Sequence, residues 1–260
     1  MNTPDRILYD ACPLCISSEI VSLRITNCEN HPLYDPRLGS TMLWKQCDEC
    51  EHVFTAGYFT EQANAILFKK VNEHQKVGVN AEASRYISAR MVEKVLPYAH
   101  EGIWLDVGFG NGSLLCTAQE YGFLPIGIDM RSDNVNDLKA KGIEAHRVPF
   151  NELALPEKCS VISMADVLEH VAFPIKALQA AKSMLKPGGV LFLSMPNSDS
   201  EVWRALDAQQ ANPYWGELEH FHNFSKGRLY TLLRECGLTP VRYGISERYR
   251  TCMEVIALNG

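Results

Sequence analysis

The sequence contains no hydrophobic run that approaches the roughly 20 residues needed to cross a bilayer. Its first ten residues, MNTPDRILYD, lack the basic stretch and the following apolar stretch of a secretory signal. Internal repeats and low-complexity segments are also missing from the sequence. We therefore expect a cytoplasmic protein that does not associate with a membrane.

An excess of basic residues is missing too. The chain has 25 Lys and Arg residues against 31 Asp and Glu residues, which gives a formal net charge of −6. Binding to long nucleic acids depends on clustered Lys and Arg, so this balance argues against a nucleic-acid partner. A length of 260 residues allows one substantial core and one small additional module.

The sequence contains nine cysteines, and four of them form two closely spaced pairs, Cys12-Pro-Leu-Cys15 and Cys47-Asp-Glu-Cys50. In a reducing cytosol such pairs indicate a metal site rather than disulfides. Four thiolates match the tetrahedral ligand set of a structural Zn²⁺ ion, and they leave no open position for catalysis. The pattern predicts that Cys12, Cys15, Cys47 and Cys50 bind zinc. The alternative is reduced thiols without a metal.

The N-terminal region differs from the rest of the chain. Residues 1–60 are rich in turn signals and lack both a long helical period and a strong hydrophobic core. We expect a small zinc-ribbon-like module there, because a bound metal can supply folding free energy that a small core lacks. Residues 61–100 are predicted to form a helical linker or lid, with a helix over about 81–97.

Strands and helices alternate from residue 102 onward. The pattern predicts strands at 103–106, 125–129, 161–164 and 190–195, and helices from 112, over 131–141 and over 174–185. Such alternation is typical of a parallel sheet with helices on both faces, so we expect a Rossmann-like α/β domain over 101–260. In its tail, a helix between Ser225 and Gly237 precedes β-like segments at about 239–246 and 250–258.

A glycine loop lies between the first predicted strand of this domain and the helix after it. Side chains at Gly108, Gly110 and Gly112 would keep a ligand from approaching the backbone. Asp106, two residues before the first glycine, suits a cationic ligand group such as an ammonium or a sulfonium. Dinucleotide-binding loops, in contrast, usually follow the GxGxxG pattern and bind a pyrophosphate. Asp129 closes the next strand, where a carboxylate can accept both hydroxyls of a ribose.

Four segments resemble the successive motifs of the class I methyltransferases that depend on S-adenosylmethionine (SAM). They are Leu105-Asp-Val-Gly-Phe-Gly-Asn-Gly-Ser113, Gly127-Ile-Asp129, Asp166-Val-Leu-Glu-His170 and Leu185-Lys-Pro-Gly-Gly-Val190. Their order and spacing match over about 100–258. The resemblance implies a seven-stranded, mostly parallel sheet whose last strand is antiparallel and inserted beside the previous one.

The resemblance also implies a binding site for SAM. It assigns the methionine end of SAM to the glycine loop, the ribose to Asp129 and the adenine to Asn151. The residues that we predict to bind the cofactor are Asp106, Gly108, Phe109, Gly110, Gly112, Asp129, Met130, Asn151 and Asp166.

The cysteine pairs ahead of this core resemble the zinc module of the sugar C-methyltransferases of deoxysugar pathways and of related natural-product enzymes. In those enzymes the zinc module and the C-terminal region together cover the substrate. Glu51 departs from the pattern, since that family commonly has Gly at this position. Some rRNA guanine methyltransferases also begin Cys-Pro-Leu-Cys, but their second ligand pair is closer and includes a histidine.

Methyl transfer to oxygen or carbon requires removal of a proton, and histidine suits a base near neutral pH. The predicted substrate-covering loop, about 196–225, contains Glu219-His220, which resembles the Glu-His segment of the sugar C-methyltransferases. In those enzymes the histidine is the base and the acid orients it. We therefore expect His220 to act as the base with Glu219 orienting it, and we keep His222 and His170 as further candidates. The alternative for each histidine is a structural role, with its ring bonded to the backbone.

These features predict a SAM-dependent methyltransferase that methylates an oxygen or carbon of a small molecule, such as a sugar, a nucleotide-sugar or another natural-product intermediate. Three alternatives remain open. An RNA methyltransferase would need a basic groove. A catalytically inactive SAM-binding regulatory protein would use the zinc module to bind a partner. A Rossmann enzyme that uses NAD would bind NAD in preference to SAM.

Overall fold

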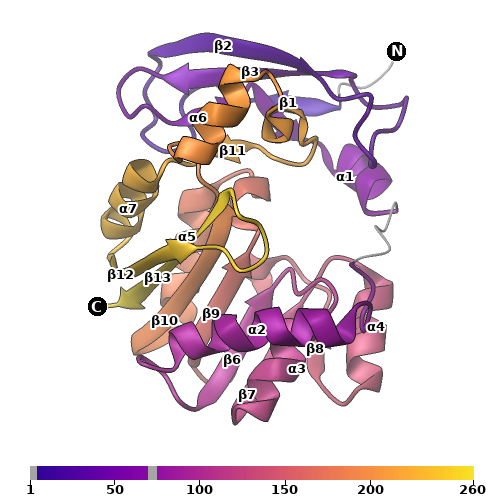
Figure 1. Ribbon diagram of the computed structural model, residues 1–260, viewed down its shortest axis with the longest axis vertical. Coiled ribbons are helices and arrows are strands. Elements are labelled where there is room, and N and C mark those ends of the chain that lie inside the picture. The colour runs from indigo at the N-terminus through magenta and orange to yellow at the C-terminus, as the bar shows by residue number, and fades with distance from the viewer. Residues whose placement is uncertain (1–4, 70–74) are drawn as a thin grey trace. The chain divides into compact units, whose positions relative to one another are not determined.

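The computed structural model describes residues 5–69 and 75–260 (Figure 1). The chain forms two compact units: unit 1 comprises residues 1–70, 169–174 and 196–231, and unit 2 comprises residues 71–168, 175–195 and 232–260. Residues 1–4, at the start of the predicted zinc module, and residues 70–74, in the predicted linker, lie outside the described residues.

Unit 2 contains a seven-stranded sheet with the strand order β12-β13-β10-β9-β6-β7-β8. Its strands are β6 (Gly102–Val107), β7 (Phe123–Ile128), β8 (Glu144–His146), β9 (Cys159–Ala165), β10 (Leu185–Pro196), β12 (Leu238–Ile245) and β13 (Cys252–Asn259). The pairs β6–β7, β6–β9, β7–β8 and β9–β10 are parallel, and β12–β13 is antiparallel. This is the predicted Rossmann-like sheet, with the last strand inserted between β12 and β10.

The helices of the α/β pattern occur where the sequence predicts them. They are α2 (Ala81–Val95), α3 (Ser113–Glu120), α4 (Ser132–Ala140), α5 (Pro174–Met184) and α7 (Lys226–Glu235). Ser225 caps α7, since its Oγ accepts a hydrogen bond of 3.1 Å from the backbone N of Arg228. Strand β10 begins at Leu185 rather than at 190, because Leu185 pairs with Cys159 before the ladder is interrupted up to Val190.

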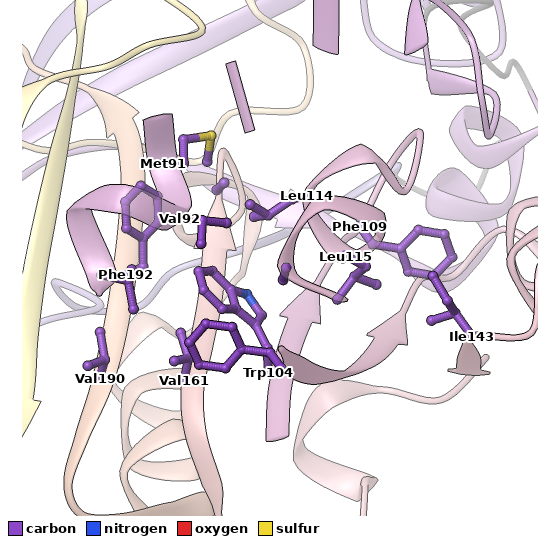
Figure 2. Packing of buried hydrophobic residues seen from close by; sticks show 14 of the residues in the cluster. Met91, Val92, Trp104, Phe109, Leu114, Leu115, Ile143, Val161, Val190 and Phe192 are labelled. Carbon is purple, nitrogen blue, oxygen red and sulfur yellow. The ribbon is translucent and has the colours of Figure 1, made fainter. Parts of the chain in front are cut away.

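One face of the sheet packs against α2 and α3. Trp104 of β6 is fully buried and contacts Phe123 edge-on, with 5.0 Å between the ring centroids. Met91 from α2 and Leu114 from α3 belong to the same hydrophobic cluster, which Figure 2 shows from close by. This packing fixes the end of β6 and the start of α3, and therefore the glycine loop that joins them.

Unit 1 contains a four-stranded sheet with the order β11-β4-β3-β2 and a two-stranded sheet, β1-β5. Its elements are β1 (Arg6–Leu8), β2 (Ile20–Asn27), β3 (Thr41–Cys47), β4 (Val53–Thr55), β5 (Gly57–Phe59), β11 (His222–Asn223), α1 (Glu61–Phe68) and α6 (Glu201–Ala208). All pairs with known register in these sheets are antiparallel. The N-terminal strands therefore share a sheet with a strand from the far end of the sequence.

The core of unit 1 also combines distant parts of the chain. Trp44 of β3 is fully buried, and its indole Nε1 donates a hydrogen bond of 2.9 Å to the backbone carbonyl of Trp215. Trp203 of α6 contacts Trp215 at 5.4 Å between ring centroids. The weak core that the sequence shows before residue 60 is thus completed by aromatic residues between 203 and 221.

None of the helices within the described ranges, 5–69 and 75–260, is both long enough and apolar enough for a membrane span.

Candidate active site and cysteine cluster

The glycine loop adopts backbone conformations that favour glycine. The φ angles of Gly108, Gly110 and Gly112 are +69°, +55° and +72°. An added Cβ would lie 2.9 Å from Val167 at Gly108 and 2.9 Å from Leu138 at Gly112. At Gly110 it would meet nothing closer than a backbone oxygen at 4.0 Å. Gly108 and Gly112 therefore pack tightly, whereas Gly110 faces open space that a ligand can use.

Asp106 lies at the end of β6 and is only 2% exposed. Its Oδ1 accepts a hydrogen bond of 2.6 Å from the Oγ of Ser163, which in turn accepts one of 2.9 Å from the indole N–H of Trp104. Burial raises the pKa of Asp106 to about 6, although the bond from Ser163 acts in the opposite direction. The carboxylate is therefore oriented, mostly ionised at neutral pH and suited to a cationic ligand group.

Asp129 follows β7 and is 5% exposed. Arg131 donates three hydrogen bonds to its carboxylate, from the backbone N at 2.9 Å, from Nε at 2.8 Å and from Nη2 at 2.7 Å. The backbone N of Gly110 lies 3.3 Å from Asp129 Oδ2. The acid predicted to bind a ribose is thus next to the open glycine, but Arg131 already occupies its oxygens. Nothing in the sequence motifs indicates this role of Arg131.

Asp166 follows β9, which is the neighbour of β6 in the sheet. Its φ of +60° is in the left-handed region, and its Oδ1 accepts a hydrogen bond of 3.0 Å from the Oγ of Ser194. Arg248 forms an ion pair with Asp166 Oδ2 at 3.4 Å. Because β9, β6 and β7 are adjacent and parallel, Asp166, Asp106 and Asp129 lie at the same edge of the sheet, where ligands of α/β folds bind.

The three remaining cofactor candidates differ in what they can offer. Phe109 is 3% exposed, and a Cβ at Gly127 would lie 2.6 Å from its ring, so only its backbone is available to a ligand. Met130 is 39% exposed, and its carbonyl accepts a hydrogen bond of 2.9 Å from Arg147. Asn151 is exposed on a short 3-10 helix.

A cluster of ionisable side chains lies in unit 1. Glu169, His170 and His220 each offer one potential ligand atom, and these atoms lie within 4.8 Å of one another. The rings of the two histidines are edge-on, with 4.6 Å between their centroids. Burial, and secondarily the charge of His170, lowers the pKa of His220 well below its usual value. His220 is therefore neutral at neutral pH and carries one nitrogen lone pair.

Glu219 contributes to this cluster through its backbone. Its carbonyl oxygen lies 3.0 Å from Nδ1 of His170, so the ring can donate a hydrogen bond to it. Among the described residues, the carboxylate grouped with the two rings belongs to Glu169, which is 1% exposed. Glu169 had not been singled out from the sequence, although it stands next to His170 in the Asp166–His170 motif.

His222 has a different environment from that of His220. Its Nε2 lies 2.9 Å from the carbonyl of Val171, and its Nδ1 lies 3.0 Å from Nε2 of His52. Nε2 must carry the proton that it donates to the carbonyl, so Nδ1 accepts the bond from His52. Burial lowers the pKa of His222 to about 3. With both ring nitrogens engaged, His222 fits the structural alternative that we kept open for each histidine.

The four cysteines of the two pairs lie together in unit 1. The Sγ atoms of Cys12 and Cys50 are 3.6 Å apart, and those of Cys15 and Cys47 are 3.4 Å apart. All four sulfur atoms lie within 4.8 Å of one another. A tetrahedral zinc ion with Zn–S bonds of about 2.3 Å would hold its sulfur ligands about 3.8 Å apart. The cluster therefore has dimensions that suit such an ion.

The turns around the two cysteine pairs are equivalent. The backbone N of Ile16 donates to the carbonyl of Cys12 at 3.0 Å, and that of Glu51 donates to the carbonyl of Cys47 at 2.9 Å. Ile16 and Glu51 both have a left-handed φ, of +63° and +57°. Glycine adopts this conformation without strain. This explains why the sugar C-methyltransferases commonly have Gly at the position of Glu51.

Comparison with known proteins identifies the fold and the domain. The family described as "Methyltransferase domain" matches residues 79–243. The chain belongs to this methyltransferase family. The match includes the glycine loop and the histidines, and it begins after both cysteine pairs. It confirms the predicted class of SAM-dependent methyltransferases, while the likeness to sugar C-methyltransferases stays a prediction.

Two relatives of this methyltransferase chain are named "Ubiquinone biosynthesis O-methyltransferase". The protein of Cereibacter sphaeroides is 30% identical over 176 residues, which cover 63% of this chain and 68% of the relative. That of Haemophilus ducreyi is 35% identical over 105 residues, which cover 36% of this chain and 44% of the relative. The chain therefore spans less than half the length of the Haemophilus ducreyi protein.

Solved structures show the same fold. The 1,6-didemethyltoxoflavin-N1-methyltransferase of Burkholderia thailandensis, crystallised with 1,6-didemethyltoxoflavin and S-adenosylhomocysteine, aligns with a TM-score of 0.57. The alignment covers 81% of this chain and 96% of that protein at 17% sequence identity. This likeness confirms the predicted fold class.

Proposed function

We propose that the protein is a SAM-dependent methyltransferase that transfers a methyl group to a hydroxyl oxygen of a small molecule. One observation carries the proposal: the open position at Gly110 lies next to Asp129, and Asp106 and Asp166 end adjacent strands at the same edge of the sheet. The family match and the names of the two O-methyltransferase relatives support it.

The residues at this edge fit the parts of SAM, which supplies a methyl group activated by a sulfonium. Asp106 would pair with the ammonium of the methionine part, since an oriented and buried carboxylate favours a cation. Asp129 would accept the ribose hydroxyls, and the backbone of the loop around Gly110 would lie against the ligand. Met130, which follows Asp129 in the sequence, and Asn151 are both exposed, and we assign them to the adenine.

An oxygen acceptor must lose its proton during the transfer, and we assign this step to the histidine pair. His220 is neutral, so its ring has a free lone pair, and the burial that lowers its pKa also makes this lone pair less basic than that of an exposed histidine. His170 is fixed by the carbonyl of Glu219, which gives the pair a defined geometry and Glu219 a positioning role. Asp166 and His170 are four positions apart in the sequence and belong to the same motif.

We further propose that Cys12, Cys15, Cys47 and Cys50 hold a structural zinc ion. The spacing of their sulfurs and the two equivalent turns support this assignment. C-methylation of a sugar or nucleotide-sugar is the second candidate reaction, favoured by the cysteine pairs and by Glu219-His220. Cytoplasmic location and the absence of a nucleic-acid partner remain predictions from the sequence.

A direct test incubates the purified protein with SAM labelled in its methyl group. The acceptor panel should contain hydroxylated aromatic compounds, nucleotide-sugars, other natural-product intermediates and bulk RNA. We expect label in a small molecule, attached through oxygen, and a loss of more than tenfold in kcat for His220→Ala. Label on carbon would favour the second candidate. Label only in RNA, or SAM binding without any transfer, would overturn the proposal.

A further inference from the structure

Unit 1 contains a second group of metal-ligating side chains besides the cysteine cluster. The group consists of Glu169, His170 and His220, whose potential ligand atoms lie within 4.8 Å of one another. Glu169 is 1% exposed and His220 is 8% exposed. One carboxylate and two imidazoles form a frequent ligand set for divalent transition metals.

The hydrogen bonding of His170 matches that of a metal ligand. Its Nδ1 faces the carbonyl oxygen of Glu219 at 3.0 Å, so Nδ1 must carry the ring proton. The lone pair of a neutral ring is then on Nε2. Histidines that bind metals usually donate their other ring N–H to a carbonyl or a carboxylate in this way, which fixes the ring and its tautomer.

His220 supplies an independent observation. Its Nδ1 is buried and has no hydrogen-bond partner among the residues described. A buried polar atom without a partner loses its hydration without compensation, which costs roughly 1–3 kcal/mol. A cation bound between this ring, His170 and Glu169 would compensate for that loss.

We propose that Glu169, His170 and His220 bind one divalent transition-metal ion, such as Zn²⁺, through one carboxylate oxygen and two imidazole nitrogens. Binding would draw the ligand atoms to about 3.4 Å from one another, given bonds of about 2.0–2.1 Å. Three protein ligands leave a coordination position for water or for a hydroxyl group. The cysteine cluster, with four thiolates, leaves none.

The inference goes beyond the proposed function, because ion binding does not depend on methyl transfer. It does change the role of His220. A bound ion would engage the lone pair of His220, and the ion itself would lower the pKa of a hydroxyl group bound to it. Proton acceptance by His220 itself then applies to the protein without this ion.

Cobalt loading distinguishes the two metal sites. The metal-free protein is loaded with Co²⁺ and dialysed, and the ions bound per chain are counted by mass spectrometry. Thiolate ligands give Co²⁺ an intense charge-transfer absorption, whereas nitrogen and oxygen ligands give only weak bands. We expect two ions per chain, of which one contributes the thiolate absorption.

The variants Glu169→Gln and His170→Ala should bind one ion per chain and keep the full thiolate absorption. This absorption shows that the cysteine cluster in unit 1 is still folded in each variant. Glu219→Gln is the matched control, since only the backbone carbonyl of Glu219 contacts His170, and it should bind two ions.

A single ion per chain, accounted for by the thiolate absorption, would overturn the inference, and so would two ions in both His170→Ala and Glu169→Gln. SAM binding and methyl transfer are measured on the same samples. A second ion without SAM binding would refute the proposed function alone, and SAM-dependent transfer with one ion would refute the metal site alone.

Discussion

Arg131 holds both carboxylate oxygens of Asp129, with its Nε 2.8 Å from Oδ1 and its Nη2 2.7 Å from Oδ2. These are the oxygens that we assign to the hydroxyls of the SAM ribose. A ligand must therefore displace the guanidinium or share the carboxylate with it. The affinity for SAM should reflect this competition.

Replacing Arg131 with Ala should tighten SAM binding about fivefold. The reason is that a ligand no longer has to displace hydrogen bonds worth about 1 kcal/mol. Isothermal titration of SAM into both proteins measures the change. Arg85→Ala is a suitable control, because Arg85 pairs with Glu120 on an exposed surface. Weaker binding by Arg131→Ala would mean that the arginine contacts the ligand instead of competing with it.

The pKa of Asp106 predicts how SAM binding depends on pH. Burial raises this pKa to about 6, so the carboxyl is neutral below that pH and anionic above it. Since the anion attracts the ammonium of SAM, affinity should rise about tenfold between pH 5 and pH 7. Ser163→Ala removes the hydrogen bond that lowers this pKa and should move the midpoint to higher pH.

The control for this prediction is Asp106→Asn, which should bind SAM weakly at every pH between 5 and 7. An affinity that changes with pH as much in Asp106→Asn as in the unaltered protein would assign the titration to another group.

His222 should make the protein sensitive to acid. Its pKa is lowered to about 3 in the folded chain, below the 6.5 of an exposed histidine. Its contribution to stability is therefore present above pH 6.5 and is lost as the pH falls toward 3. This loss amounts to at most about 1.4 kcal/mol per pH unit.

The variant His222→Gln keeps a donor for the Val171 carbonyl and cannot titrate in this range. Its free energy of unfolding can be measured by urea denaturation between pH 4 and 6.5. As the pH falls, we expect this free energy to decline less steeply than in the unaltered protein, and the difference in slope should correspond to about one proton. Equal slopes in the two proteins would show that His222 does not couple folding to pH.

The turn after the first cysteine pair predicts opposite effects for two similar substitutions. Ile16 and Ile25 are both exposed, at 80% and 71%, but Ile16 has a φ of +63° and Ile25 lies in strand β2. In the zinc-loaded protein Ile16→Gly should raise the free energy of unfolding by about 0.5 kcal/mol, because the strain of a left-handed residue is relieved.

In contrast, Ile25→Gly should lower the free energy of unfolding by about 0.5–1 kcal/mol, since glycine weakens a strand. Chemical denaturation of both variants measures the two changes. Destabilisation by both substitutions would indicate that the turn is not strained.

The sequence was most informative where local patterns decide the structure. The alternation of apolar strands and helices predicted the sheet of unit 2, and the spacing of Gly108, Gly110 and Gly112 placed the ligand-binding loop. The predicted start of β10, at residue 190, was less accurate, because the pairing of Leu185 with Cys159 depends on a neighbouring strand.

Contacts between distant segments could not be predicted in this way. The pairing of Trp44 with Trp215 joins residues 171 positions apart, and no periodicity in either segment encodes it. The grouping of Glu169 with His220 also joins distant segments, and no local pattern predicts it. The ion pair of Arg131 and Asp129 is local, but side-chain direction after a strand does not follow from spacing alone.

The proposed function depends on binding of SAM at the glycine loop, which can be measured by titrating SAM into the protein and into Gly110→Val. A valine at position 110 would fill the open space and would be strained at a φ of +55°. Gly108 and Gly112 are unchanged in this variant and should preserve the turns of the loop. We expect one SAM per chain for the unaltered protein, no binding of NAD, and an affinity for SAM at least tenfold weaker in Gly110→Val. Unchanged SAM affinity in a folded Gly110→Val protein, or binding of NAD in place of SAM, would contradict it.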